Sequence, residues 1–167
     1  MSKIDFSDIN VPELIADMWE PLTEEQREYL SEHFTIQNFK KCEVVHFEGE
    51  TPTHLMCLLT GKVKIYKDGV GGRSQIIRMM KPVEYFGYRA YFSEQAYVTA
   101  AAAFEPSVIC LIPMTVITKL IRQNNDLAMF FIKQLSNDLG MSDTRTVNLT
   151  QKHIRGRLAE SLLFLKE

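Results

Sequence analysis

The stretch HLMCLLTGKVKIYKDG (residues 54–69) decides the fold. It holds two β-rich runs, at 54–60 and 62–67, which Gly61 separates. The second run ends at Asp68-Gly69, a dipeptide that tolerates the positive φ angles of a tight turn. Short runs separated in this way are typical of an antiparallel sandwich or barrel. The stretch therefore predicts neighbouring strands of an all-β body.

The same pattern of short β-rich runs separated by turn residues extends from Thr35 to Pro113. Further strands are predicted at 35–40, 43–47, 74–80, 97–103 and 107–112, with residues 70–73 lengthening the hairpin loop after Gly69. On both sides of this body the pattern changes to helix, and the predicted helices are 12–19, 24–33, 114–122, 127–148 and 150–167. The sequence thus predicts a mainly β fold with flanking helices, divided into residues 1–113, 114–149 and 150–167.

Two helical segments carry specific signals. Thr23 and Gln26 have the spacing of a capping box at the start of the helix predicted for 24–33. In the long helix, five apolar residues recur at helical spacing: Ala128, Phe131, Ile132, Leu135 and Leu139. Leu127, Phe130 and Met141 point elsewhere, which predicts two partners for this helix, the β body and a second copy of the chain.

Composition limits the class of protein. The 167 residues are 46% hydrophobic and 24% charged, values typical of a folded globular domain rather than a disordered chain. The formal net charge of -2 lacks the cationic excess that DNA-binding domains usually have. The sequence has no basic segment followed by an apolar leader, and no apolar stretch near the ~18 residues of a membrane span, so we expect a cytoplasmic protein without a membrane partner.

Catalytic and metal-binding patterns are absent from the sequence. It contains no G-x-S-x-G, H-E-x-x-H, P-loop or G-x-G-x-x-G motif, and the glycines at 69, 71 and 72 fit a hairpin loop. Cys42, Cys57 and Cys110 form no C-x-x-C pair and lie in apolar runs, which predicts buried free thiols. We therefore expect neither an enzyme nor a metal site.

Several motifs together resemble the cyclic AMP receptor protein / fumarate and nitrate reductase regulator (CRP/FNR) family. Residues 47–50 (FEGE) are similar to its Gly-Glu corner, residues 58–64 (LLTGKVK) to a second glycine corner, and Phe86-Gly87 to the start of its phosphate-binding cassette. Residues 126–149 have the length of its dimerisation helix. Residues 156–163 (GRLAESLL) resemble the segment that precedes its DNA-binding domain.

This resemblance implies a double-stranded β-helix, or jelly roll, of the cyclic-nucleotide-binding type, followed by a dimerisation helix. It implies the effector-sensing and dimerising part of a transcription regulator. The implied partners are a second copy of the chain, DNA through a winged helix-turn-helix domain beyond Glu167, and RNA polymerase. We expect the natural chain to continue past Glu167. The alternative is a stand-alone regulatory module that acts on a protein partner, and a chain that truly ends at Glu167 would favour it.

The resemblance also marks a candidate effector site, whose residues are Phe86, Gly87, Tyr88, Arg89, Ala90, Tyr97, Val98, Ser142 and Asp143. Family members that bind a cyclic nucleotide have a Glu directly after the cassette glycine, which contacts the ribose, and an Arg about ten residues later, which pairs with the phosphate. This chain has Tyr88 at the first position, and Tyr97 or Val98 at the second. We therefore expect that it does not respond to cyclic AMP.

The nature of the effector stays open. Aromatic residues and the Met79-Met80 pair suit a small, partly apolar ligand, but the same residues would equally fill the space of a nucleotide. An iron–sulfur sensor of this family needs four Cys ligands and is excluded by three. Haem is disfavoured, although His46, His54 or Cys57 could act as an axial ligand. The predicted dimerisation residues are Phe131, Leu135, Leu139 and Ser142.

Overall fold

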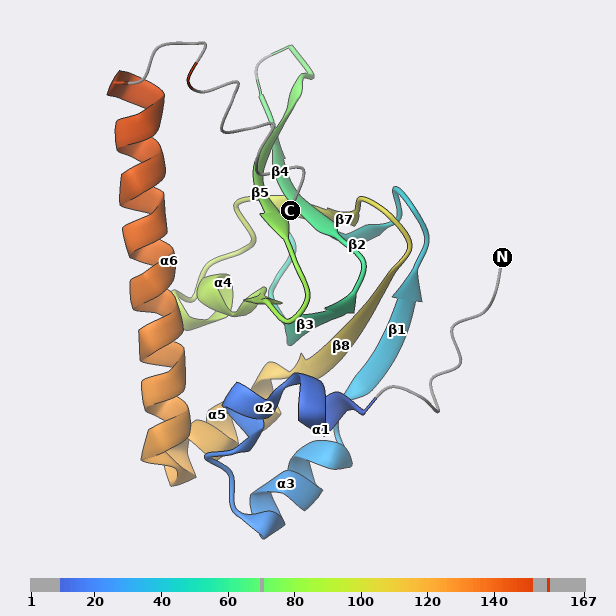
Figure 1. The fold of residues 1–167 in the computed structure, drawn as a ribbon. Coiled ribbons are helices and arrows are strands. Elements are labelled where there is room, and N and C mark those ends of the chain that lie inside the picture. The colour runs from blue at the N-terminus through green and yellow to red at the C-terminus, as the bar shows by residue number, and fades with distance from the viewer. Residues whose placement is uncertain (1–9, 70, 152–155, 157–167) are drawn as a thin grey trace. The chain divides into compact units, whose positions relative to one another are not determined.

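A computed structural model describes residues 10–69, 71–151 and 156 of the chain. The chain divides after Ala128 into two units, residues 1–128 and 129–167. The first unit contains both β-sheets and five helices of the described chain (Figure 1). Most of the long helix belongs to the second unit.

Three short helices precede the first strand: α1 (Val11–Leu14), α2 (Ala16–Trp19) and α3 (Glu24–Ser31). The predicted helix at 12–19 is broken at Ile15, and α3 ends two residues before the predicted His33. The predicted capping box is confirmed, because the Thr23 Oγ1 accepts a hydrogen bond from Gln26 N at 3.3 Å and the Gln26 Oε1 accepts one from Thr23 N at 3.2 Å. The two bonds satisfy free N–H groups at the start of α3.

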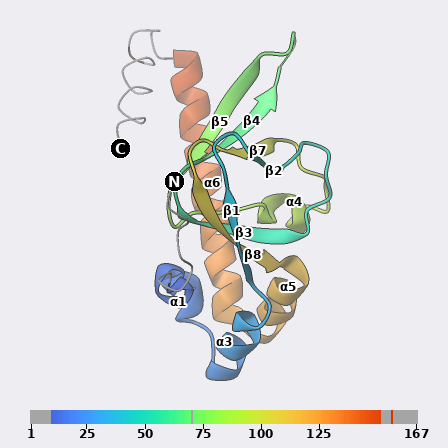
Figure 2. The ribbon, with the colours of Figure 1, turned by 90° about the vertical axis from the view of Figure 1, so that its right-hand side faces the viewer.

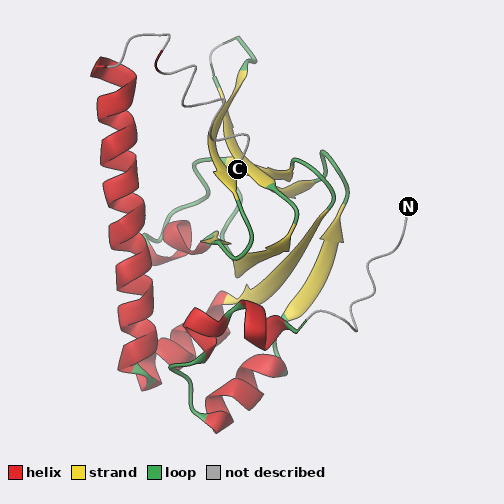
Figure 3. Cartoon of the chain, in the orientation of Figure 1, coloured by secondary structure: helices red, strands yellow, loops and turns green. Residues whose placement is uncertain are grey.

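Eight strands form two four-stranded sheets. The strands are β1 (Thr35–Phe39), β2 (Val44–His46), β3 (His54–Thr60), β4 (Val63–Asp68), β5 (Ser74–Met80), β6 (Tyr85–Phe86), β7 (Ala100–Ala103) and β8 (Ser107–Pro113). One sheet has the order β1-β8-β3-β6 and the other β2-β7-β4-β5. All of these pairs are antiparallel. The structure therefore confirms the mainly β fold with flanking helices, and Figure 3 shows the strands gathered in one body.

One predicted strand begins later than expected, and one strand of the structure is not predicted. The predicted strand 97–103 begins only at Ala100, so Tyr97 and Val98 lie in the preceding loop. The sequence pattern does not predict β6, whose two residues pair with Met56 and Cys57 of β3. The hairpin of β4 and β5 has the predicted position and extends beyond the other strands of its sheet (Figure 2).

The core lies on both faces of β3. Met56 and Leu58 belong to a cluster of buried residues inside the roll, together with Phe39, Val63, Met80, Phe86, Ala90, Tyr97, Ala101, Ala103 and Ile109. The alternating residues Leu55, Cys57 and Leu59 are equally buried, and they point to the opposite face because side chains alternate along a strand. Helix α5 (Met114–Gln123) contacts β3 and β8. A strand buried on both faces explains the nearly continuous apolar run at 55–59.

Two cysteines are buried as predicted, and the third is not. Cys57 and Cys110 lie directly opposite each other on β3 and β8, and neither is accessible to solvent. Burial raises the pKa of both thiols, so they stay protonated and unreactive near neutral pH. Cys42 is exposed, because it lies in the turn between β1 and β2, where its backbone has a φ of 68°.

The last described helix is α6 (Asn125–Gln151), which begins after an extended Asn124. It starts two residues before the predicted Leu127 and continues three residues past the predicted Asn148. Of the predicted dimerisation residues, Phe131 is buried, Leu135 is half-buried, and Leu139 and Ser142 are exposed. The separate helix predicted for 150–167 falls largely outside the described residues. Within the described part of the chain, no helix is both long and apolar enough to cross a membrane.

Candidate effector site

The turn between β6 and α4 (Tyr88–Phe92) is formed by Gly87, which has a φ of +89°. A Cβ added to Gly87 would overlap the Met56 Cε, and it would lie 3.0 Å from the His54 carbonyl oxygen and 3.2 Å from the Tyr97 Oη. Only glycine combines this backbone conformation with so little space. The same distances place the Tyr97 hydroxyl directly beside the start of α4.

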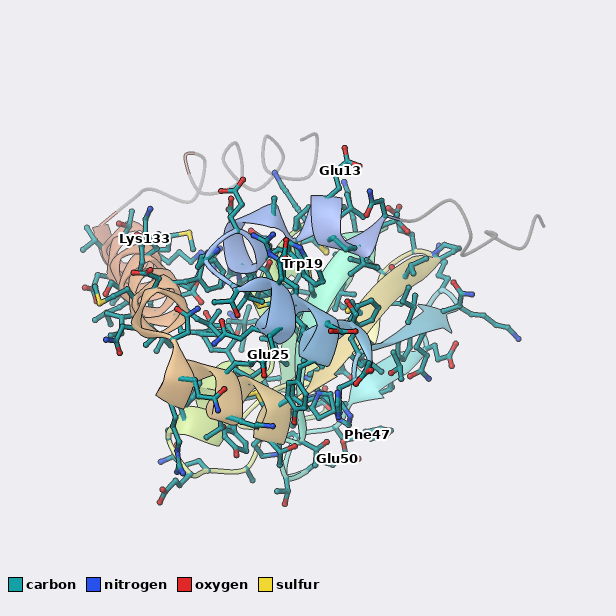
Figure 4. The ribbon with its side chains drawn as sticks, turned by 90° about the horizontal axis from the view of Figure 1, so that it is seen from below. Glu13, Trp19, Glu25, Phe47, Glu50 and Lys133 are labelled. Atoms are coloured by element: carbon teal, nitrogen blue, oxygen red, sulfur yellow. The ribbon has the colours of Figure 1, made fainter. Side chains whose placement is uncertain are left out.

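Tyr97 is held in this position by its backbone. Its carbonyl oxygen accepts a hydrogen bond from Gly49 N at 2.8 Å, and its N–H donates to the Glu50 carbonyl oxygen at 2.9 Å. The corner that contains Gly49 and Glu50 is itself closed by a bond from Phe47 N to the Glu50 Oε2, at 2.9 Å. Figure 4 shows Phe47 and Glu50 close together at this corner. The glycine corner that the sequence singles out therefore positions Tyr97.

The ring of His46 stacks on the ring of Tyr97. The ring centroids are 3.8 Å apart and the planes are inclined by 24°. His46 lies opposite Ala101 of the core cluster, and both rings are buried, with 7% and 8% of their surface exposed. The His46 Nδ1 is buried and has no hydrogen-bond partner among the residues that the structure describes. The stacked pair thus lies inside the roll, between β2 and the start of α4.

Burial keeps both rings uncharged. Desolvation lowers the pKa of His46 to about 4, against opposing contributions from the Phe47 backbone and the Glu50 carboxylate. Desolvation, followed by the Glu50 charge, raises the pKa of Tyr97 to about 12. Near neutral pH the pair therefore offers no positive charge to a phosphate.

The structure brings together only part of the predicted site. Phe86, Ala90 and Tyr97 share the core cluster, and Tyr88 is also buried. The two other residues of this region are directed to solvent: Arg89 is exposed, and Val98 is 43% exposed. Tyr88 stands where the resemblance leads one to expect a Glu, and Val98 stands at one of the two positions for the expected Arg. Neither side chain is charged.

The remaining predicted site residues, Ser142 and Asp143, are exposed on the part of α6 that belongs to the second unit. The sequence patterns do not assign His46 to this site and leave it only as a candidate haem ligand. The signal that could have found it is weak, because a single histidine in a β-strand is usually an ordinary core or surface residue. Only the fold reveals that β2 places it against Tyr97.

Comparison with known proteins identifies the class to which this roll belongs. Residues 36–124 match the family model of the cyclic nucleotide-binding domain. The match covers more than half of the chain, and the chain therefore belongs to the cyclic nucleotide-binding domain family.

The relatives include regulators of the CRP/FNR family. The chain is 29% identical over 124 residues to an uncharacterized protein of Haemophilus influenzae, of which it covers 95%. It is 26% identical over 139 residues to the cAMP-activated global transcriptional regulator CRP of Pasteurella multocida. That match covers 83% of this chain but 66% of the regulator, so the chain spans about two-thirds of the length of this relative.

Solved structures agree on the fold. The sensor domain of the transcriptional regulator DNR from Pseudomonas aeruginosa superimposes with a TM-score of 0.69 at 24% identity, and the match covers 80% of this chain and 91% of that domain. The catabolite activator protein of Thermus thermophilus gives a TM-score of 0.67 at 19% identity, over 80% of this chain and 63% of the activator. The jelly-roll prediction and the resemblance to this family are confirmed.

Proposed function

We propose that this chain is the effector-sensing and dimerising part of a CRP/FNR-type transcription regulator. The family match over 36–124 and the likeness to CRP of Pasteurella multocida support this role. By the same likeness, a second copy would pair through α6, and a further domain beyond Glu167 would bind DNA in the cytoplasm and contact RNA polymerase. A change in the roll would be transmitted through the paired helices to the DNA-binding domains. We propose neither an enzymatic activity nor a cofactor for the chain.

We further propose that the effector is not a cyclic nucleotide. The observation that carries this proposal is the position of the Tyr97 hydroxyl, which lies 3.2 Å from a Cβ added to Gly87, in the segment that resembles the family's phosphate-binding cassette. The phenol ring already occupies this part of the roll and stacks on His46. Tyr88 supplies no carboxylate for a ribose hydroxyl, and neither stacked ring is positively charged near neutral pH.

A thermal-shift series with cyclic AMP and cyclic GMP tests the second proposal. Because the Tyr97 ring lies beside Gly87 and neither stacked ring is charged near neutral pH, we expect an unchanged melting temperature for the 167-residue protein at millimolar nucleotide. A nucleotide-dependent rise that saturates at micromolar concentration would contradict the proposal.

The length of the native protein tests the first proposal against a stand-alone module. The 167 residues have a mass of 19.3 kDa. An intact mass of the protein isolated from its own cells that exceeds this value by one small domain would support the regulator. A native mass of 19.3 kDa would instead favour the module that acts on a protein partner.

A further inference from the structure

The turn between α2 and α3 is held by side chains that donate to three consecutive carbonyl oxygens. Arg27 donates from Nε to the Trp19 oxygen at 3.2 Å and from a terminal nitrogen to the Glu20 oxygen at 3.0 Å. Asn124 donates from Nδ2 to the Pro21 oxygen at 2.8 Å. Figure 4 labels Trp19 beside this turn. Asn124 comes from the other end of the first unit, between α5 and α6, so it joins segments that are far apart in the sequence.

Asn124 makes two further hydrogen bonds. Its Nδ2 donates to the Gln26 Oε1 at 2.8 Å, and its Oδ1 accepts from Leu127 N at 3.1 Å. The second bond is an N-cap, which satisfies a free N–H in the first turn of α6. The Gln26 Oε1 also accepts from Thr23 N in the capping box of α3. A single oxygen atom therefore joins the cap of α3 to the residue that caps α6.

We infer that Asn124 is a positioning residue that ties the start of α6 to the N-terminal helices. The side chain must supply one acceptor to Leu127 and two donors to Pro21 and Gln26, and only an amide of this length combines them. The α2–α3 turn and the start of α3 thereby act as a clamp on the first turn of α6. The role of α6 in dimerisation, on which this inference rests, comes from the proposed function.

The clamp has a mechanical consequence. Asn124 has an extended backbone, with φ −138° and ψ 106°, so the chain direction changes at this residue between two helices. A few residues at the end of an element are where a hinge normally lies. The three side-chain bonds restrict this hinge. An event that displaces the α2–α3 turn would release them and loosen the start of α6.

Asn124→Asp separates the two functions of the side chain. The carboxylate retains the acceptor for Leu127 and loses both donors, so the cap of α6 remains while the clamp is lost. The measurement is the distance distribution between nitroxide labels at Asn38 on β1 and Asn137 on α6, both exposed positions. The labels are placed in a Cys42→Ser background, and labelled protein is diluted with unlabelled protein so that distances within one chain are recorded. The buried Cys57 and Cys110 stay unlabelled.

We expect Asn124→Asp to roughly double the width of this distribution at unchanged helix content, because the restriction on the hinge is lost. Gln26→Glu is the matched control, since its carboxylate still accepts both bonds, and it should keep the parental width. A parental width in Asn124→Asp would overturn the inference. If that variant does not fold, Gln26→Ala removes one acceptor of the clamp, and an unchanged width there would overturn the inference equally.

Light scattering on the parental protein distinguishes a failure of the proposed clamp from a failure of the proposed dimerisation through α6. A monomer would contradict the dimerising role of α6 but would leave the distances within one chain interpretable. A dimer with an unaffected Asn124→Asp distribution would contradict the clamp alone.

Discussion

The imidazole of His46 stacks on the phenol of Tyr97 at 3.8 Å inside the roll, and the Tyr97 hydroxyl lies beside Gly87 at the start of α4. The two rings thus fill the interior of the roll beside the start of α4, the part of the fold in which we propose that no cyclic nucleotide is held. Both rings are neutral near pH 7, which suits an apolar interior and offers nothing to a phosphate.

Removal of the Tyr97 side chain should leave a cavity of phenol shape. We expect Tyr97→Ala to lower the free energy of unfolding by about 3–5 kcal/mol, the usual cost of truncating a buried aromatic ring. Because apolar cavities bind matching small molecules, p-cresol should raise the melting temperature of this variant. Urea denaturation and thermal shift measure the two effects.

Tyr97→Phe is the matched control, because it retains the ring and loses only the hydroxyl. It should cost about 1 kcal/mol or less and should not respond to p-cresol. A Tyr97→Ala variant as stable as the parent would show that the ring does not fill the interior.

His46 should make stability depend on pH in a defined direction. Its pKa is lowered from 6.5 to about 4 on folding, so the unfolded chain takes up this proton first as the pH falls. The stabilising contribution is complete above pH 6.5 and is lost progressively down to pH 4. Between about pH 7.5 and pH 5 it should decline by about 2 kcal/mol.

The difference in unfolding free energy between the parent and His46→Leu, measured in urea at several pH values, isolates this contribution. Gln75→Leu, a change at an exposed and non-titratable position of β5, is the control and should leave the pH dependence as in the parent. A parent-like decline in His46→Leu would assign the pH dependence to other groups.

Alanine substitutions at two glycines with the same backbone conformation distinguish the cost of steric crowding from the cost of backbone strain. Gly87 and Gly49 have φ values of +89° and +88°, but a Cβ meets close atoms only at Gly87. Gly49→Ala should cost about 1 kcal/mol, the strain of a left-handed alanine. Gly87→Ala should cost about 2 kcal/mol more, because the methyl group crowds the His54 carbonyl and displaces the Tyr97 hydroxyl. Equal costs, measured by denaturant unfolding, would contradict the close approach of Tyr97.

The sequence predicts correctly the strands and the helix cap that are formed by interactions between residues close together in the chain. β3 and β5 begin and end where the β-rich runs do, and the Thr23–Gln26 capping box forms as predicted. Strand β6 has only two residues and exists through its pairing with Met56 and Cys57, which no local pattern encodes.

The site was only partly predictable for the same reason. The change from Glu and Arg to Tyr88 and Tyr97 or Val98 can be read from the sequence. The strand predicted at 97–103 is wrong at its start, because long-range backbone bonds to Gly49 and Glu50 hold Tyr97 in a loop. The contact of Tyr97 with His46 depends on that loop and therefore emerges only from the fold.

The exposed apolar residues of α6 predict self-association. Ile132 and Leu139 are 53% and 64% exposed and lie seven residues apart, which is the spacing of the apolar positions in a helix–helix interface. We expect the protein to be a dimer in light scattering, and Leu135→Glu and Leu139→Glu to be monomers because a buried unpaired carboxylate is costly. Lys133→Gln, an exposed change on the same helix, should remain dimeric. Unchanged dimers in both Glu variants would place the interface elsewhere.

Calorimetric titration of cyclic AMP into the parental protein tests the central claim most directly. If Tyr97 and His46 occupy the nucleotide position, no heat of binding should be measurable up to millimolar nucleotide, and cyclic GMP should behave in the same way. Binding of either nucleotide with a micromolar Kd and one site per chain would contradict the account.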